Sequence, residues 1–243
     1  RPAARLPAVS VVVPAFNEER RIGATLARIE EYCAGALEDY EIIVVDDGSR
    51  DRTGEVCLES VKDHARLRVV RNDPNRGKGY SVRVGALAAR MPFILLSDAD
   101  LSTPIEEVEH LLPLASTRNI VIASRGLRNS TLEVRQPFYR EMMGKVFNRI
   151  VQILLLPGIS DTQCGFKLFG RDVVREVFPR MTIERFAFDV EILALALRKG
   201  FEVREVPVRW RNDDRTRVDA VRDSASMFRD VIGVWWKLRG VRD

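Results

Sequence analysis

Short apolar runs alternate with helix-like segments along the first half of the chain. Ser10 to Pro14 (SVVVP) predicts a strand, and Ile22, Leu26, Ile29 and Cys33 behind it predict one face of a helix. Further strands are predicted at Tyr40 to Val45, Leu67 to Val70, Phe93 to Ser97 and Ile120 to Ser124, with helices near Thr53 to His64, from NDPNRGKG through Ala89, and from Pro104. Repeated βα units with continuous apolar strands predict an α/β fold, with a mostly parallel sheet covered by helices on both faces.

The second half has longer helical patterns and fewer strands. We expect helices over 136–156, 188–199 and about 219–238, and strands over 162–169 and 203–208. No repeat or low-complexity linker separates the halves, so we expect one domain over 1–243. Its two halves would be about 1–125 and about 126–243.

Carboxylates follow two of the predicted strands. Asp46 and Asp47 end EIIVVDD, and Asp98 and Asp100 follow FILLS. A lone DxD sequence is common, but open α/β sheets bind ligands at the carboxyl ends of their strands, where these four side chains would converge. Such carboxylates can hold a divalent metal, and the metal can hold a diphosphate. The pattern favours an enzyme acting on a nucleotide-linked substrate.

Composition and the absence of certain motifs argue against several other classes of protein. With 46% apolar and 30% charged residues, the chain is a folded protein rather than a disordered one. Its three cysteines form no CxxC pair, so neither a disulfide framework nor a zinc site is indicated. GxGxxG and GxxxxGK[ST] are both absent, which argues against dinucleotide oxidoreductases and P-loop enzymes. The only histidines, His64 and His110, fall in positions that predict exposed helix, so histidine-based chemistry is poorly supported.

Arginine dominates the basic residues. The net charge is only +4, but 33 of the 39 basic residues are arginine. The segment from Arg118 to Arg149 contains seven basic residues and only two acidic ones. Biased genomic composition is one explanation, and recognition of phosphate by arginine forks is the other. The local excess favours an anionic partner, either a phosphate or a membrane surface.

Two further segments have alternative interpretations. Asn17 and Glu18 follow the first strand at the expected ligand edge, although both residue types also suit a helix start. Lys78 stands between two glycines in RGKG, which suits a phosphate contact at a helix start or a plain turn.

Ordered motifs spanning almost the whole chain carry a family resemblance. VVVPAFNEE, VVDDGSRDRT, NRGKG, LLSDADLSTP, ASR and DTQCGFKLF resemble the family 2 inverting glycosyltransferases of GT-A fold. DTQCGFKLF followed by ERFAFDVEIL and VPVRW most resembles the dolichyl-phosphate β-glucosyltransferases. Dolichyl-phosphate mannose synthases and bacterial polyprenyl-phosphate glycosyltransferases are close relatives of that group. The resemblance assigns the first half to the nucleotide and the second half to the acceptor.

The resemblance implies a metal and a nucleotide sugar at the strand ends. Asp98 and Asp100 match the metal motif, in which Mg²⁺ or Mn²⁺ bridges the diphosphate of the donor. Ser102 stands where mannose synthases often carry a glutamine, so the third metal ligand stays open. The residues that would contact the nucleotide sugar are Pro14, Ala15, Phe16, Glu18, Asp46, Asp47, Lys78, Asp98 and Ala99.

Arginines of the second half would hold the phosphate of the acceptor. The matching residues are Arg125 in ASR, Arg140 in FYRE, and one or more of Arg211, Arg215 and Arg217 in WRNDDRTRV. The family more often has Gly-Ser-Lys near the last of these. Asp189 and Glu191 in FDVEIL fall where many family 2 enzymes place a catalytic acid pair, with helix packing as an alternative role. The predicted catalytic set is Asp100, Arg125, Arg140 and Asp189.

The implied activity is metal-dependent, inverting transfer of a sugar to a polyprenyl or dolichyl phosphate, with UDP-glucose as the expected donor. A lipid phosphate is already anionic, so a strong general base is less necessary, and positioning with charge neutralisation can carry the catalysis. A GDP-mannose donor and a soluble acceptor are alternatives, and a non-catalytic nucleotide-sugar binding module is the least favoured. Nucleic acid is not an expected partner.

Two segments suggest contact with a membrane surface. The helix over 136–156 and the segment SMFRDVIGVWWKLRG combine apolar faces with Trp, Arg and Lys, as interfacial helices do, although such helices also cover cores. No apolar stretch reaches the ~18 residues of a spanning helix. We expect a peripheral enzyme on the cytoplasmic face of a membrane, with a spanning segment outside this chain as an open alternative.

Overall fold

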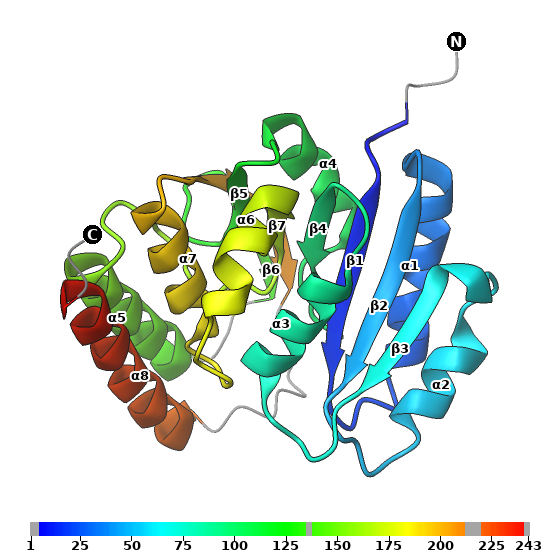
Figure 1. Ribbon diagram of the computed structural model, residues 1–243, viewed down its shortest axis with the longest axis horizontal. Coiled ribbons are helices and arrows are strands. Elements are labelled where there is room, and N and C mark those ends of the chain that lie inside the picture. The colour runs from blue at the N-terminus through cyan, green and yellow to red at the C-terminus, as the bar shows by residue number, and fades with distance from the viewer. Residues whose placement is uncertain (1–4, 135–137, 212–219, 241–243) are drawn as a thin grey trace.

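A seven-stranded sheet forms the centre of the computed structural model, which describes residues 5–134, 138–211 and 220–240 (Figure 1). The strand order is β3-β2-β1-β4-β7-β5-β8. The strands are β1 (Val9–Ala15), β2 (Tyr40–Asp46), β3 (Leu67–Arg71), β4 (Phe93–Leu96), β5 (Asn119–Ser124), β7 (Lys167–Gly170) and β8 (Glu202–Pro207). Only β7 runs antiparallel to its neighbours, so the expected mostly parallel sheet is confirmed.

Helices cover both faces of this sheet because successive strand residues point to opposite sides. Ile42 and Val44 of β2 belong to one buried cluster, and Ile43 and Val45 belong to the other. The first cluster lies under α1 (Ile22–Ala36), α2 (Thr53–Ser60) and α4 (Val108–Leu111). The second lies under α3 (Lys78–Ala88), α6 (Arg171–Val177) and α7 (Phe188–Arg198).

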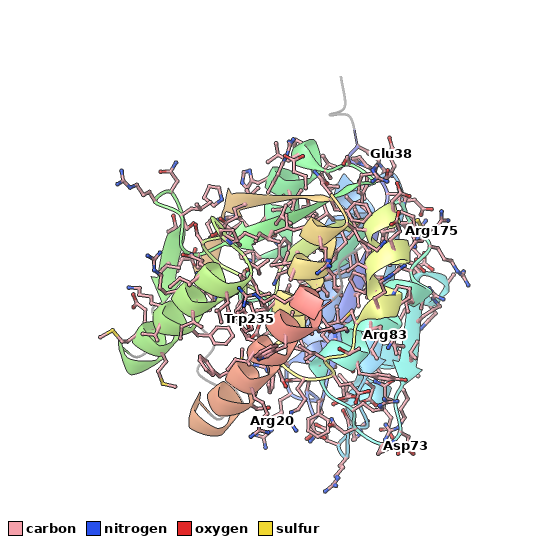
Figure 2. All side chains as sticks on the ribbon, turned by 60° about the vertical axis from the view of Figure 1, so that its left-hand side comes forward. Arg20, Glu38, Asp73, Arg83, Arg175 and Trp235 are labelled. Atoms are coloured by element: carbon pink, nitrogen blue, oxygen red, sulfur yellow. The ribbon has the colours of Figure 1, made fainter. Side chains whose placement is uncertain are left out.

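The remaining elements are short or lie at one side. Single 3-10 turns are η1 (His64–Arg66), η2 (Ile105–Glu107), η3 (Leu112–Leu114) and η4 (Phe178–Arg180). A separate parallel pair joins β6 (Thr131–Val134) to β9 (Arg209–Arg211). The helices α5 (Phe138–Leu154) and α8 (Ala220–Gly240) contact each other, and Figure 2 shows them side by side with Trp235 on α8. None of the described helices is both long enough and apolar enough to cross a bilayer.

The structure corrects two of the expected elements. A strand over 162–169 was wrong in extent, because only Lys167–Gly170 pairs with the sheet. Before β7, the N–H of Gln163 donates instead to Oδ1 of Asp161 at 3.2 Å, and the N–H groups of Ser160 and Asp161 donate to the carboxylate of Glu205 at 2.8 and 3.0 Å. The helix from Pro104 is broken into η2, α4 and η3.

The parallel strands end at one edge of the sheet, and the loops after them form the candidate site. In Figure 2, Arg20 after β1 and Asp73 after β3 lie at this lower edge, while Glu38 lies at the opposite edge. The three cysteines are buried and free, and both histidines are exposed.

Candidate active site

The loop after β4 presents two carboxylates, and its backbone is tied on both sides. The hydroxyl of Thr25 in α1 donates to the carbonyl of Ala99 at 2.7 Å. The backbone N–H of Ser102 donates to Oδ1 of Asp100 at 2.9 Å. These bonds fix a loop in which Asp98 and Asp100 stand at the carboxyl end of a central strand, as the sequence predicts.

Negative charge at this loop is only partly balanced by the protein. Nζ of Lys78 lies 2.6 Å from Oδ1 of Asp98. Burial alone would lower the pKa of Lys78, but Asp98, Asp189 and Asp100 outweigh burial and raise it. Burial and the neighbouring Asp98 raise the pKa of Asp100. Two hard oxygen donors whose charge is only partly balanced fit a divalent cation such as Mg²⁺ or Mn²⁺.

The protein supplies few further ligands for such a cation. Among the described residues, no group of three or more His, Cys, Asp or Glu side chains is placed to hold a metal. A metal at Asp98 and Asp100 would therefore take its remaining ligands from substrate oxygens and water.

A turn from DTQCGFKLF closes one side of the site. A Cβ on Gly165 would lie 1.9 Å from Oδ2 of Asp98, so only glycine fits there. The turn is held by the buried side chain of Lys167, whose Nζ donates to the carbonyl of Cys164 at 2.5 Å and to Oδ1 of Asp189 at 2.6 Å. Lys167 therefore joins this turn to the first turn of α7.

Asp189 is buried beside this centre. Burial raises its pKa, and the positive charges of Lys167 and Lys78 oppose that rise. Glu191 instead accepts bonds from the backbone N–H groups of Thr182 and Ile183, each at 2.8 Å. The two acidic residues thus have different surroundings, since Asp189 interacts electrostatically with Lys78 and Asp98, whereas Glu191 holds the segment before α7.

The acidic pair after β2 organises loops. Asp46 is only 1% exposed, and it accepts bonds from the N–H of Ser49 at 2.9 Å and from Arg71 at 2.7 Å. Asp47 accepts from the side chain of Asn72 at 2.9 Å and from the N–H groups of Arg76 at 3.1 Å and Gly77 at 2.7 Å. The carboxylate of Asp47 therefore fixes the loop that leads to Lys78.

Replacement of Asp47 by alanine should loosen that loop. Since a buried hydrogen-bonding group is lost and two backbone N–H groups lose their acceptor, we expect a loss of about 1–3 kcal/mol in unfolding free energy. We also expect UDP affinity to fall at least ~10-fold, equivalent to ~1.4 kcal/mol. Thermal unfolding and calorimetric titration with UDP measure the two effects.

A matched control is Asp63→Ala, which removes a carboxylate that accepts a backbone N–H beside η1, where no predicted site residue lies. UDP affinity should not change in that variant. Weaker UDP binding by Asp47→Ala without any loss of stability would assign Asp47 to the nucleotide directly rather than to the loop.

The end of β1 contributes a mixed polar and apolar surface. Pro14 is half-buried, Ala15 is buried and its carbonyl accepts the N–H of Asp47 at 2.8 Å, and Phe16 is 38% exposed. Glu18 forms an ion pair with Arg21, with one contact at 2.7 Å. These residues line the same strand-end edge as the loops after β2 and β4.

Arg125, the first residue after β5, is already engaged within the protein. Its Nε and Nη2 donate to the two oxygens of Asp161, at 2.6 and 2.9 Å, and its guanidinium lies 5.2 Å from the ring centre of Trp210. Burial would lower the pKa of Arg125, but Asp161 outweighs it and raises that pKa. Arg125 thus remains charged and fixed in orientation.

The other predicted acceptor arginines are described only in part. Arg211 is exposed at the end of β9, and its backbone N–H donates to the backbone carbonyl of Ser102 at 2.8 Å. This bond brings β9 next to the loop that carries Asp100. The side chain of Arg140 and all of Arg215 and Arg217 lie outside the described residues.

Sequence reasoning missed three residues that support the site. Asp161 and Lys167 lie within the motif DTQCGFKLF, whose charged residues were not singled out, and Arg21 follows the predicted Glu18. Arg21 also opposes the rise in the pKa of Asp100. A basic or acidic residue inside an apolar strand motif, such as Lys167 in GFKLF, was the available signal.

The fold and the strand-end acidic motif together define a GT-A glycosyltransferase. Similar solved structures include glucosyl-3-phosphoglycerate synthase from Mycobacterium tuberculosis in complex with Mn²⁺, UDP and phosphoglyceric acid. That structure has a TM-score of 0.72 and 20% identity, over 97% of this chain and 80% of that chain. Another, described as a mycobacterial protein, has a TM-score of 0.70 and 23% identity, over 100% of this chain and 77% of that chain.

The chain belongs to the family described as Glycosyl transferase family 2, whose profile matches residues 10–178. It is 36% identical to the dolichyl-phosphate beta-glucosyltransferase of Dictyostelium discoideum, over 93% of this chain and 73% of that protein. The enzyme of the same name from Drosophila melanogaster is 38% identical, over 93% and 74% respectively. The predicted family and fold are therefore confirmed, and the chain is a glycosyltransferase.

Proposed function

We propose that this glycosyltransferase moves glucose from UDP-glucose to the phosphate of dolichol or a similar polyprenol, with inversion at the anomeric carbon. The observation that carries the proposal is the extent of the similarity to the dolichyl-phosphate glucosyltransferases. It covers 93% of this chain and so continues past residue 178, where the family profile ends. The continued part includes three of the five proposed acceptor arginines, namely Arg211, Arg215 and Arg217.

The donor would bind at the carboxyl ends of β1, β2 and β4. Asp98 and Asp100 would hold Mg²⁺ or Mn²⁺, which when bound supplies positive charge to the diphosphate leaving group. Asp47 would act by holding the loop of Lys78, and Asp46 by holding the turn after β2. The remaining proposed contacts with the nucleotide sugar are Pro14, Ala15, Phe16, Glu18, Lys78 and Ala99.

The acceptor phosphate would meet arginines that remain positively charged. Arg125 is oriented by Asp161, and Arg211 is carried by a strand tied to the Asp100 loop. Arg140, Arg215 and Arg217 complete the proposed set. Guanidinium groups recognise phosphate through paired N–H donors, so such a set favours a phosphate acceptor over a sugar hydroxyl.

The chemistry then needs little proton transfer. An oxygen of the lipid phosphate attacks the anomeric carbon, the bond from that carbon to UDP breaks, and UDP leaves with the electron pair. In-line attack converts an α-linked donor into a β-linked product. Arg125 positions the nucleophile, and Asp189 contributes negative charge beside Lys78, which helps hold the lysine at the site.

Arg211 offers a direct test of the acceptor side. Because its side chain is exposed and its strand is adjacent to the Asp100 loop, Arg211→Ala should raise the Michaelis constant for dolichyl phosphate about 10-fold, ~1.4 kcal/mol. The dissociation constant of UDP should change less than about 2-fold, since only an acceptor contact is lost. Steady-state kinetics and calorimetry measure the two effects.

Arg209→Ala is the matched control, because Arg209 lies two residues earlier on β9 and pairs with Glu107 at 2.6 Å. The Michaelis constant of Arg209→Ala for dolichyl phosphate should equal that of the unaltered protein. Weaker UDP binding in Arg211→Ala, with an unchanged Michaelis constant for the acceptor, would move Arg211 to the donor site.

A lipid acceptor also requires approach to a membrane, which we propose occurs at its cytoplasmic face through α5 and α8. These neighbouring helices carry exposed large apolar side chains mixed with basic ones, as interfacial helices do. The exposed apolar residues are Met142, Val146 and Ile153 on α5, and Phe228, Ile232 and Trp236 on α8.

The donor and acceptor classes are tested by one panel. UDP-glucose, GDP-mannose and other radiolabelled sugar nucleotides are each incubated with dolichyl phosphate or with soluble phosphorylated acceptors. The proposal expects transfer from UDP-glucose to the lipid. A preference for GDP-mannose would replace the proposed donor. Transfer to a soluble acceptor without lipid would replace the proposed acceptor.

A further inference from the structure

Lys78 occupies a position that conflicts with a simple nucleotide-contact role. Its ammonium group lies 2.6 Å from Oδ1 of Asp98, and both side chains are about 30% exposed, at 28% and 31%. Asp98 is also a proposed metal ligand. A lysine ammonium has only donors, and a divalent cation also seeks carboxylate oxygen, so the two cations compete for the same group.

The backbone around Lys78 has little freedom to move away from this position. Asp47 holds the N–H groups of Arg76 and Gly77. Gly77 has φ of +110°, and a Cβ there would lie 2.5 Å from the carbonyl oxygen of Glu184. The helix start therefore packs closely against the segment before α7, and only the four-carbon side chain of Lys78 can change direction.

The charges around Lys78 explain why its side chain points to Asp98. Asp98, Asp189 and Asp100 all stabilise the ammonium form, against the effect of burial. Without another cation, Lys78 is the nearest compensation for the negative charge of Asp98. A divalent cation at Asp98 would repel the ammonium, and the diphosphate of a nucleotide would attract it.

We propose that Lys78 is an exchangeable counter-ion: it pairs with Asp98 before substrate binds, gives up that carboxylate to the divalent metal, and then pairs with the nucleotide diphosphate. The metal alone must displace Lys78 from Asp98 and leave it only the weaker attraction of Asp189, whereas metal and nucleotide together provide a new partner. Metal and nucleotide therefore strengthen each other's binding, and this coupling is reciprocal. The inference rests on the proposed donor site, but not on the identity of the sugar or the acceptor.

The test uses Mn²⁺ alone as its first probe. Free Mn²⁺ is measured by electron paramagnetic resonance while the full chain is titrated, without nucleotide and then with saturating UDP. In Lys78→Met, which keeps the length of the side chain but not its charge, Mn²⁺ alone should bind about 10-fold more tightly than in the unaltered protein. The strengthening of Mn²⁺ binding by UDP should fall at least about 10-fold.

Two further variants separate charge exchange from a structural effect. Lys78→Arg keeps a cation, so Mn²⁺ alone should still bind weakly. Lys199→Met removes a lysine of matched exposure, 27%, that pairs with Glu176 at 3.2 Å at the end of α7. That control should leave Mn²⁺ binding unchanged, with and without UDP.

Unchanged or weaker binding of Mn²⁺ alone to a folded Lys78→Met protein would overturn the inference, as would the same gain in Lys78→Arg. The inference and the proposed function can fail separately. If the exchange is observed but no glucose reaches a lipid phosphate, the sugar or the acceptor assignment is wrong and the inference stands.

Discussion

Asp100→Asn should lower glycosyl transfer at least ~1000-fold, equivalent to ~4 kcal/mol in the activation barrier. The neutral amide keeps the shape of the side chain but removes a charge proposed to bind the metal that neutralises the leaving diphosphate. Oδ1 of Asp100 accepts the N–H of Ser102, and an amide oxygen can still accept that bond. The rate of sugar transfer is measured together with the melting temperature.

The melting temperature of Asp100→Asn should stay close to that of the unaltered protein, because the residue lies in a strand-end loop and the amide can keep the bond from Ser102. Excess chelator should abolish the activity of the unaltered protein, and Mg²⁺ or Mn²⁺ should restore it. Full activity of the variant, or of the unaltered protein in chelator, would contradict the metal assignment.

Gly165→Ala should have the second largest effect. The new methyl group would be placed 1.9 Å from Oδ2 and 2.3 Å from Cγ of Asp98, so the short aspartate side chain must turn away. Since Asp98 is proposed to hold both the metal and Lys78, we expect Mn²⁺ binding in the presence of UDP to weaken at least ~100-fold, ~2.7 kcal/mol. Calorimetric titration of Mn²⁺ into the UDP complex measures this loss.

Gly35→Ala is the control for Gly165→Ala, because an added Cβ at that position in α1 meets no heavy atom within 4 Å. Its Mn²⁺ binding should be normal. Normal Mn²⁺ binding by Gly165→Ala as well would mean that Asp98 can move without cost and that the turn does not shape the metal site.

The sequence predicts the central strands well because their pattern is local. β1, β2 and β4 are continuous apolar runs, and each is followed by the polar residues that mark its carboxyl end. The position of β7 between β4 and β5 is different, because it depends on partners more than 40 residues away in sequence. The strands β6 and β9 have only 4 and 3 residues, and most of these are exposed, so the sequence contains no apolar pattern that predicts them.

The same distinction applies to the candidate site. Asp98 and Asp100 could be found because a strand signal directly precedes them. The bonds from Lys167 to Asp189 and from Arg125 to Asp161 join residues 22 and 36 positions apart, so they follow from tertiary packing. Asp47 follows its strand as the sequence predicts, but the sequence did not show that its carboxylate would accept two backbone N–H groups of the protein.

The most direct test of the central claim is the product formed from UDP-glucose, Mn²⁺ and dolichyl phosphate in detergent or vesicles. The account predicts a glucolipid that partitions into organic solvent, shows a β-linkage between glucose and phosphate in the coupling of its anomeric proton by NMR, and is absent with Asp100→Asn. Arg211→Ala should form it only at higher acceptor concentration. Glucose transferred solely to a water-soluble acceptor, or with an α-linkage to the lipid, would contradict the account.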